Sequence, residues 1–216
     1  IKFLGNLKFS ESKTQKNIAL NKNIEKIFKS RKIWCAVSTH NGEEKICAEA
    51  HQKLKKKYKK LLTVIIPRHV HRVNDIYKEI VDMGFKVQIH SKKSKIKKDT
   101  DIYLVDTYGE TKSFFKICNT VFLGGSIVNH GGQNPLEPAR FGCKILHGPN
   151  IQNFTEVYRL LNKENLSFKF YNTNQLAKSV NQSLNQNMNF SKKIAKLKKI
   201  GSNILHHTSA EINCFL

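Results

Sequence analysis

Three segments of this sequence pair a helix-capping residue with a glutamate three positions later. The pairs are Asn41 with Glu44, Thr107 with Glu110, and Asn134 with Glu137. Amide hydrogens at a helix start attract phosphate, and a glutamate beside a phosphate can accept hydrogen bonds from a ribose diol. The same spacing also describes a capping box without a ligand, and for any one segment both interpretations stay open. Together the three segments indicate a site for phosphate and ribose.

Glycine, proline and arginine accompany these segments. Four glycines that would let a ligand approach the backbone are Gly124, Gly125, Gly131 and Gly132. Pro135 stands where a helix start accepts proline. The segment 67–72, PRHVHR, holds two of the five arginines, and a guanidinium suits phosphate or carboxylate. Its His69 and His71 could ligate a metal, but no carboxylate or third ligand is suitably spaced, so we expect no metal there.

The apolar pattern predicts the elements that must position these residues. Buried strands are predicted at 33–38, 62–66, 86–89, 102–105, 121–124, 144–147 and 168–171. Helices are predicted at 43–59, 73–83, 110–118, 135–141, 154–162, 173–184 and 191–212. This alternation favours an α/β fold with a doubly wound parallel sheet. The capping segments and residues 67–72 then meet at the carboxyl edge of the sheet, where ligands bind.

Composition bounds the class of protein. The 216 residues, 39% of them hydrophobic, suffice for one well-cored domain or two small ones, and no run is long enough to cross a bilayer. The formal net charge is +22, with lysines gathered at 53–60, 92–98 and 192–199. Residues 106–159, which include the glycine segments, carry five basic and four acidic side chains. This near-neutral stretch argues against a nucleic-acid interface there. The five cysteines never form C-x-x-C, which favours buried thiols in a reducing cytosol.

Several familiar motifs are missing or misplaced. The sequence has no G-x-G-x-x-G after the first predicted strand, no P-loop and no nucleophile elbow, so it supports no dinucleotide fold, nucleotide triphosphatase or serine hydrolase. Asp99 and Asp101 form a D-x-D pattern that could bind a metal. This pattern precedes its predicted strand, which places it on the amino edge, away from the predicted site.

Six motifs, spread over essentially the whole chain, carry a family resemblance. They are GNLKF at 5–9, STHNGEE at 38–44, PRHVHR at 67–72, DTYGET at 106–111, FLGGSIVNHGGQNPLEPA at 122–139 and GPNIQNF at 148–154. In this order they resemble the 3-deoxy-D-manno-octulosonic acid (Kdo) transferases of lipopolysaccharide synthesis. The resemblance implies a Rossmann-like domain, the C-terminal half of a GT-B architecture. It also implies CMP-Kdo as donor, a lipid A precursor as acceptor, and inversion at the transferred sugar without a metal or cofactor.

The resemblance also assigns roles to particular residues. Those that would contact CMP are Pro67, Arg68, Tyr108, Gly109, Glu110, Asn134, Pro135, Leu136 and Glu137. Lys8 of GNLKF would stabilise the transition state as the catalytic lysine, and the general base would be a carboxylate of an N-terminal domain. Tyr108 and Thr111 depart from the family's usual Met and Leu, which we expect to alter packing around the base and leave backbone contacts in place.

The resemblance sets the expected organisation and partners. We expect residues 1–13 to be a hinge from an N-terminal acceptor domain missing from this chain, 14–190 the CMP-Kdo-binding domain, and 191–216 an amphipathic C-terminal helix. The expected location is the cytoplasmic face of the bacterial inner membrane, where the basic surface meets anionic lipid. Two alternatives remain: a GT-B transferase that uses another nucleotide sugar, and a non-catalytic, basic nucleic-acid-binding α/β module. Nucleic acid is not an expected partner of the transferase.

Overall fold

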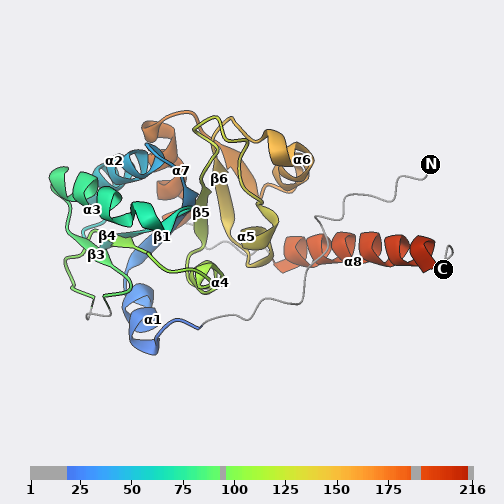
Figure 1. The fold of residues 1–216 in the computed structure, drawn as a ribbon, viewed down its shortest axis with the longest axis horizontal. Coiled ribbons are helices and arrows are strands. Elements are labelled where there is room, and N and C mark those ends of the chain that lie inside the picture. The colour runs from blue at the N-terminus through green and yellow to red at the C-terminus, as the bar shows by residue number, and fades with distance from the viewer. Residues whose placement is uncertain (1–18, 93–95, 186–190, 214–216) are drawn as a thin grey trace.

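A computed structural model describes residues 19–92, 96–185 and 191–213. Seven parallel strands form one sheet in the order β3-β4-β2-β1-β5-β6-β7 (Figure 1). The strands are β1 Lys32–Thr39, β2 Leu61–Pro67, β3 Val87–Ile89, β4 Ile102–Leu104, β5 Thr120–Leu123, β6 Lys144–His147 and β7 Ser167–Lys169. Each lies within two residues of a predicted apolar run. The doubly wound parallel sheet predicted from the sequence is confirmed.

Helices cover both faces of this sheet. They are α1 Lys22–Lys29, α2 Glu43–Lys55, α3 Val73–Asp82, α4 Thr111–Phe115, α5 Leu136–Arg140, α6 Thr155–Lys163, α7 Thr173–Leu184 and α8 Ser191–Asn213, with the 3-10 turns η2 Val70–Arg72 and η3 Gln152–Phe154. Local signals mark several ends. The side chain of Asn172 accepts the Gln175 amide at 3.0 Å to start α7, and Gly84, with φ of 85°, follows α3.

The pleat of the strands divides the core into two layers. In β1, Trp34 and Ala36 pack with α2, α3 and α7, whereas Cys35 and Val37 pack with α1, α4, α5 and α6. We call these two layers the α2/α3 face and the α4/α5 face. Because helices cover both faces, the central strands are mostly apolar, and all seven residues of β2 are buried.

The connections create one topological switch point. From β1 the chain moves to β2 and on to the β3 edge, and it returns on the other side of β1 as β5. The carboxyl ends of β1 and β5 therefore diverge into helices on different sides, which opens a crevice between them. Of the predicted segments, those after β1, β2, β4 and β5 all leave the sheet at this edge.

Two helices illustrate what the pattern did and did not predict. The α8 helix, predicted at 191–212, is confirmed; Leu197 is buried in the core, and Lys196 pairs with Glu164. Its C-terminal part projects away from the sheet (Figure 1). The α1 helix was not predicted, and it packs Phe28 against the Tyr103 ring at a centroid distance of 5.3 Å. No helix in the described ranges is both long enough and apolar enough to cross a bilayer.

The D-x-D pattern lies on the amino edge, as predicted. The Asp99 carboxylate pairs with Lys86 at 2.6 Å, and that of Asp101 pairs with Lys55 at 2.5 Å. Both acids are thus engaged with lysines. Four cysteines are free and buried, as expected from their scatter: Cys35, Cys47, Cys118 and Cys143. Burial raises the pKa of the Cys47 thiol well above its usual value, so it stays protonated. Cys214 lies outside the described residues.

Candidate functional site: a pocket at the switch point

A pocket of about 720 Å3 lies at the carboxyl edge of the sheet, at the switch point. Its lining comes from the ends of β1 and β5 and from the segments that follow β2, β4 and β5: Val37, Ser38, Arg68, Gly109, Thr111, Lys112, Phe115, Leu123, Gln133, Asn134, Glu137 and Pro138. We call this the switch-point pocket. Four of the residues predicted to contact nucleotide line it, namely Arg68, Gly109, Asn134 and Glu137. The geometry therefore brings together residues that are up to 69 positions apart.

The other predicted residues lie beside the pocket or away from it. Pro67 is the buried last residue of β2, and Pro135 and Leu136 are buried where α5 begins. Tyr108 is 67% exposed and does not line the pocket, although its neighbour Gly109 does. Lys8 lies outside the described residues, so its assigned role remains a prediction.

Glu137 and Asn134 present polar groups at the start of α5. Asn134 Oδ1 accepts the Leu136 amide at 3.1 Å, as a capping residue does. Glu137 does not complete a capping box, because its Oε1 lies 3.6 Å from Lys112 Nζ and its side chain remains 41% exposed. A carboxylate with free lone pairs in a pocket can accept hydroxyl hydrogens, which fits the ribose role expected of Glu137.

Arg68 supplies a cationic group to the same pocket. Its backbone amide donates to Thr39 O at 3.0 Å, which fixes the start of the loop after β2 against β1. The side chain is exposed, and in the described part of the chain no carboxylate lies within ion-pair distance of it. A guanidinium without an ion-pair partner can donate two parallel hydrogen bonds to an anionic group of a ligand.

Arg72, the second arginine of this segment, is used differently. Its Nη1 donates to Glu44 Oε1 at 3.1 Å, and its Nη2 lies 3.3 Å from Asn41 Oδ1. The carboxylate of Glu44 is fully buried; burial raises its pKa, and the hydrogen bond from Arg72 opposes that shift. The Asn41–Glu44 pair is therefore not a capping box. The α2 helix begins at Glu43 after Gly42, and Asn41 and Glu44 hold Arg72 in place.

Glu43, which the sequence pattern did not single out, organises the glycine segment. Its buried carboxylate accepts the His40 amide at 2.9 Å. It also accepts three successive amides after β5, those of Gly125, Ser126 and Ile127, at 2.8, 3.1 and 3.0 Å. These amides are therefore not available to a phosphate, contrary to the expectation that this segment offers its backbone to a ligand.

Two glycines serve packing within the chain. A Cβ on Gly124 would lie 2.3 Å from Ser38 O and 2.7 Å from Glu43 Oε2, so only glycine lets β5 end this close to β1. Gly131 has φ of 82°, and a Cβ there would meet the Asn153 side chain at 2.4 Å. Both glycines thus let segments of the chain approach one another closely, and the expected approach of a ligand to them stays a prediction.

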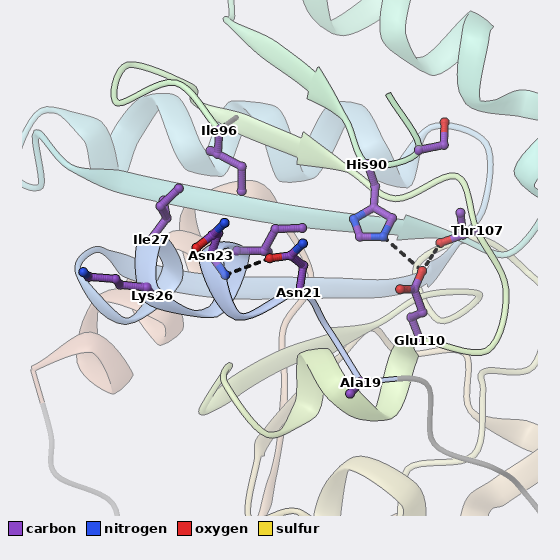
Figure 2. A pocket seen from close by; sticks show the side chains of 11 residues that line it. Ala19, Asn21, Asn23, Lys26, Ile27, His90, Ile96, Thr107 and Glu110 are labelled. Carbon is purple, nitrogen blue, oxygen red and sulfur yellow. Dashed lines mark hydrogen bonds and ion pairs between the residues drawn. The ribbon is translucent and has the colours of Figure 1, made fainter. Parts of the chain in front are cut away.

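Glu110 does not line the switch-point pocket, and its assigned contact with CMP stays a prediction. Its Oε2 lies 3.0 Å from His90 Nε2 and accepts a hydrogen bond from the Thr107 hydroxyl (Figure 2). The Thr107–Glu110 pair is thus a contact between side chains, and α4 begins at Thr111 without a side-chain cap. Glu110 lines a second pocket, of about 940 Å3, between α1 and the segments after β3 and β4.

Ser38, His40 and His130 lie at this edge and were not singled out from the sequence, and His69 and His71, considered there only as metal ligands, lie beside them. Ser38 has φ of 54° at a register shift between β1 and β2, a left-handed conformation that costs about 1–2 kcal/mol. The His40 ring lies 4.1 Å from that of His130 and 5.9 Å from that of His69, measured between ring centroids. His71 stacks on His69 at 5.6 Å. The contacts of His40 join loops that are distant in sequence, so no local sequence pattern predicts them.

The environment of His40 keeps its imidazole neutral at pH 7. Burial, together with charge repulsion from the nearby His130, His69, Arg72 and Arg68, lowers its pKa to about 4. In the described part of the chain, no three His, Cys, Asp or Glu side chains form a group that could hold a metal ion.

Comparison with known proteins yields several 3-deoxy-D-manno-octulosonic acid transferases. No protein-family model matches the chain. The 3-deoxy-D-manno-octulosonic acid transferase of Haemophilus influenzae is 34% identical over 158 residues, which cover 73% of this chain and 37% of that protein. The transferase of the same name from Aquifex aeolicus is 30% identical over 149 residues, covering 69% and 41%. The chain thus spans about two fifths of the length of these relatives.

Solved structures share the fold. The C-terminal CMP-Kdo binding domain of WaaA from Acinetobacter baumannii superposes with a TM-score of 0.69 at 23% identity, over 82% of this chain and 91% of that one. Trehalose-6-phosphate synthase OtsA gives a TM-score of 0.52 at 10% identity, over 88% and 44%. The fold is that of the C-terminal domain of a GT-B glycosyltransferase. With the sequence matches, this places the chain in the 3-deoxy-D-manno-octulosonic acid (Kdo) transferase family.

Proposed function

We propose that this chain binds CMP-Kdo and forms the donor-binding part of a Kdo glycosyltransferase. The observation that carries the proposal is the switch-point pocket, which joins Arg68, Gly109, Asn134 and Glu137. The names of the sequence relatives and of the Acinetobacter domain support the identity of the donor. In this proposal Glu137 accepts hydrogen bonds from the ribose hydroxyls, Asn134 shapes the helix start beside them, and Arg68 binds the phosphate.

The pocket then acts on the leaving group. Transfer breaks the bond between the anomeric carbon of Kdo and a phosphate oxygen, and the electron pair stays with CMP, which gains negative charge. Arg68 stabilises that charge, because a donor that is already oriented toward the phosphate contributes a few kcal/mol. Lys8, assigned by family resemblance, would add a second cation. The acceptor hydroxyl oxygen forms the new bond to the anomeric carbon and passes its proton to a general base that the family resemblance assigns to an N-terminal domain.

The acceptor and the location are a finer part of the proposal. The acceptor is a lipid A precursor in lipopolysaccharide core synthesis, met at the cytoplasmic face of the bacterial inner membrane. The formal charge of +22 supports this, because a basic surface is attracted to anionic lipid and to a phosphorylated acceptor. An N-terminal acceptor domain would complete the enzyme, since the match to the Haemophilus protein covers 37% of that protein.

Calorimetric titration with CMP, UDP and GDP tests the donor. We expect CMP to bind most tightly, and Glu137→Ala to weaken CMP binding by about 1–3 kcal/mol because a charged acceptor is lost. Glu79→Ala on α3, which does not line the pocket, is the matched control. The same preparation is expected to transfer no Kdo by itself, because the family's general base belongs to the N-terminal domain.

Each alternative has its own signature in these measurements. Preference for UDP or GDP would indicate a GT-B transferase with another nucleotide sugar. Indifference to CMP, with DNA affinity that falls steeply as salt rises, would indicate a nucleic-acid-binding module. Unchanged CMP affinity in a folded Glu137→Ala variant would contradict the ribose role, and detectable sugar transfer by this chain alone would contradict the assignment of the base.

A further inference from the structure

The histidines of the carboxyl edge lie against the switch-point pocket. We call His40, His69 and His130 the histidine cluster. His40 Nε2 is 3.5 Å from Gln133 Nε2, and Gln133 lines the pocket. His69 directly follows Arg68, which also lines it. The cluster therefore borders the pocket where the segments after β1, β2 and β5 meet.

The cluster and the proposed ribose site lie toward opposite faces of the sheet. Glu137 and Lys112 belong to α5 and α4, which pack on the α4/α5 face. His40 precedes α2, and His69 precedes η2 and α3, which pack on the α2/α3 face. A ligand whose ribose is at Glu137 and whose phosphate is at Arg68 has its remaining part directed across the edge, toward the cluster.

The charge around the cluster favours an anion. Arg68 and Arg72 lie close enough to lower the pKa of His40, as do the other two imidazoles of the cluster. The nearest acids are already occupied: Glu43 accepts four backbone amides, and Glu44 pairs with Arg72. The cluster thus offers N–H donors in a positive field, and a bound anion would relieve the repulsion among them.

We propose that the histidine cluster is a carboxylate-binding subsite that takes the sugar acid of the donor. This inference rests on the proposed function. In a CMP-linked 2-ulosonic acid, the carboxylate and the glycosidic phosphate oxygen are attached to the same carbon. A donor held at Arg68 by its phosphate therefore places its carboxylate next to that arginine, where His69 and His130 donate to it. A neutral sugar at this position would leave the imidazole donors without an acceptor.

Calorimetry with CMP and CMP-Kdo separates the carboxylate from the nucleotide. The wild-type chain is expected to bind CMP-Kdo more tightly than CMP. His69→Asn and His130→Asn, both at exposed positions, are each expected to raise the Kd of CMP-Kdo about tenfold, the value of one charge-assisted hydrogen bond, and to leave the Kd of CMP unchanged. His206→Asn, exposed on α8, is the matched control and should change neither.

A measurement on the wild-type chain needs no variant to fold. A carboxylate bound beside His40 raises the pKa of its imidazole against the opposing Arg68, Arg72, His69 and His130, while Glu43 stays bonded to backbone amides. Binding CMP-Kdo should therefore take up more protons than binding CMP. Titration at pH 6.5 in buffers of different ionisation enthalpy measures this difference, and the affinity for CMP-Kdo should rise as pH falls.

The outcomes distinguish this inference from the proposed function. If the wild-type chain fails to bind CMP, the proposed function fails. If it binds CMP but gains nothing from the sugar acid, or takes up equal numbers of protons with both ligands, the subsite is overturned and the donor pocket stands. Equal weakening of CMP and CMP-Kdo in the histidine variants would show that the cluster binds the phosphate, which also overturns the subsite.

Discussion

At the amino edge of the sheet, the Asp101 carboxylate is held by two side chains of α2 and by a backbone amide that precedes β3. It pairs with Lys55 at 2.5 Å, accepts the Lys86 amide at 3.0 Å, and lies 3.6 Å from His51 Nε2. Burial alone would raise its pKa, but the nearby His51 imidazole, Lys55 and the Lys86 amide outweigh burial and hold the pKa well below its usual value. The D-x-D pattern thus has a structural use that its sequence resemblance to a metal motif does not reveal.

Asp101→Asn should lower the free energy of unfolding at pH 7 by about 1–3 kcal/mol, because Lys55 and the Lys86 amide lose a charged acceptor. A carboxyl whose pKa is lowered by folding stabilises the native state above its unfolded pKa of about 3.9, and this contribution disappears as pH falls below that value. The variant and the wild type should therefore converge in acid. Denaturant titrations from pH 7 to pH 3 measure the difference, with the exposed Asp99→Asn as control. A difference independent of pH would contradict this account.

Glu43 and Glu137 show why residue type and spacing alone do not assign a role. Both follow a polar loop near a helix start, yet Glu43 is buried with four amide donors and Glu137 remains partly exposed in a pocket. The amides that Glu43 accepts after β5 are 82 to 84 positions away in sequence. A capping pattern describes only the next three residues, so it cannot reveal a partner from another strand.

At the scale of elements, the strands were the most predictable part. Their apolar, β-branched runs must be buried on both faces, so length and composition suffice to find them. The starts of α2 and α4 were less predictable, because Asn41 bonds to Arg72 and Thr107 bonds to the Glu110 side chain. Contacts from other segments decided between capping and pairing in both cases.

The α1 helix was missed because its sequence, KNIEKIFK, is mostly polar and short. Its place in the fold depends on one buried ring: Phe28 lies 5.3 Å from the ring of Tyr103 and 6.1 Å from that of Phe114, between centroids. Packing decided the structure of this segment, and helix propensity had little part in it. The α1 helix also forms one wall of the pocket that contains His90 and Glu110 (Figure 2).

Phe28→Ala should lower the free energy of unfolding by about 3–5 kcal/mol, since it removes a fully buried aromatic side chain. Lys29→Ala on the exposed face of the same helix should have little effect. Chemical denaturation followed by far-ultraviolet circular dichroism compares the two variants. A small loss for Phe28→Ala would show that α1 is peripheral to the core and that its packing against Tyr103 and Phe114 contributes little.

At the scale of the whole molecule, the net charge follows from composition alone and does not depend on the fold. The formal charge of +22 comes from 38 basic and 16 acidic side chains, whereas the stretch from 106 to 159 is nearly neutral. The sequence alone therefore shows that most of the excess positive charge lies outside the stretch that contains the glycine segments. It could not show that the C-terminal part of α8 projects away from the sheet (Figure 1), whereas Leu197, within the lysine-rich part of the helix, is buried in the core.

We expect the basic surface of the chain to bind anionic membranes. The chain should sediment with vesicles of phosphatidylglycerol and not with vesicles of phosphatidylcholine, because each lysine near an anionic surface contributes about 1 kcal/mol. Raising the ionic strength should weaken the binding, since exposed charges are screened over about 10 Å at 0.1 M salt. Equal binding to both lipids, or binding that salt leaves unchanged, would refute an electrostatic attraction and weaken the proposed membrane location.

The bonds of Glu43 have a consequence for how a nucleotide enters the carboxyl edge. The carboxylate holds the backbone after β5 in its final shape through interactions inside the protein, before any ligand is bound. That segment therefore loses its conformational entropy during folding, and nucleotide binding does not have to order it a second time. We therefore expect a nucleotide to bind at this edge without a conformational change in the segment after β5.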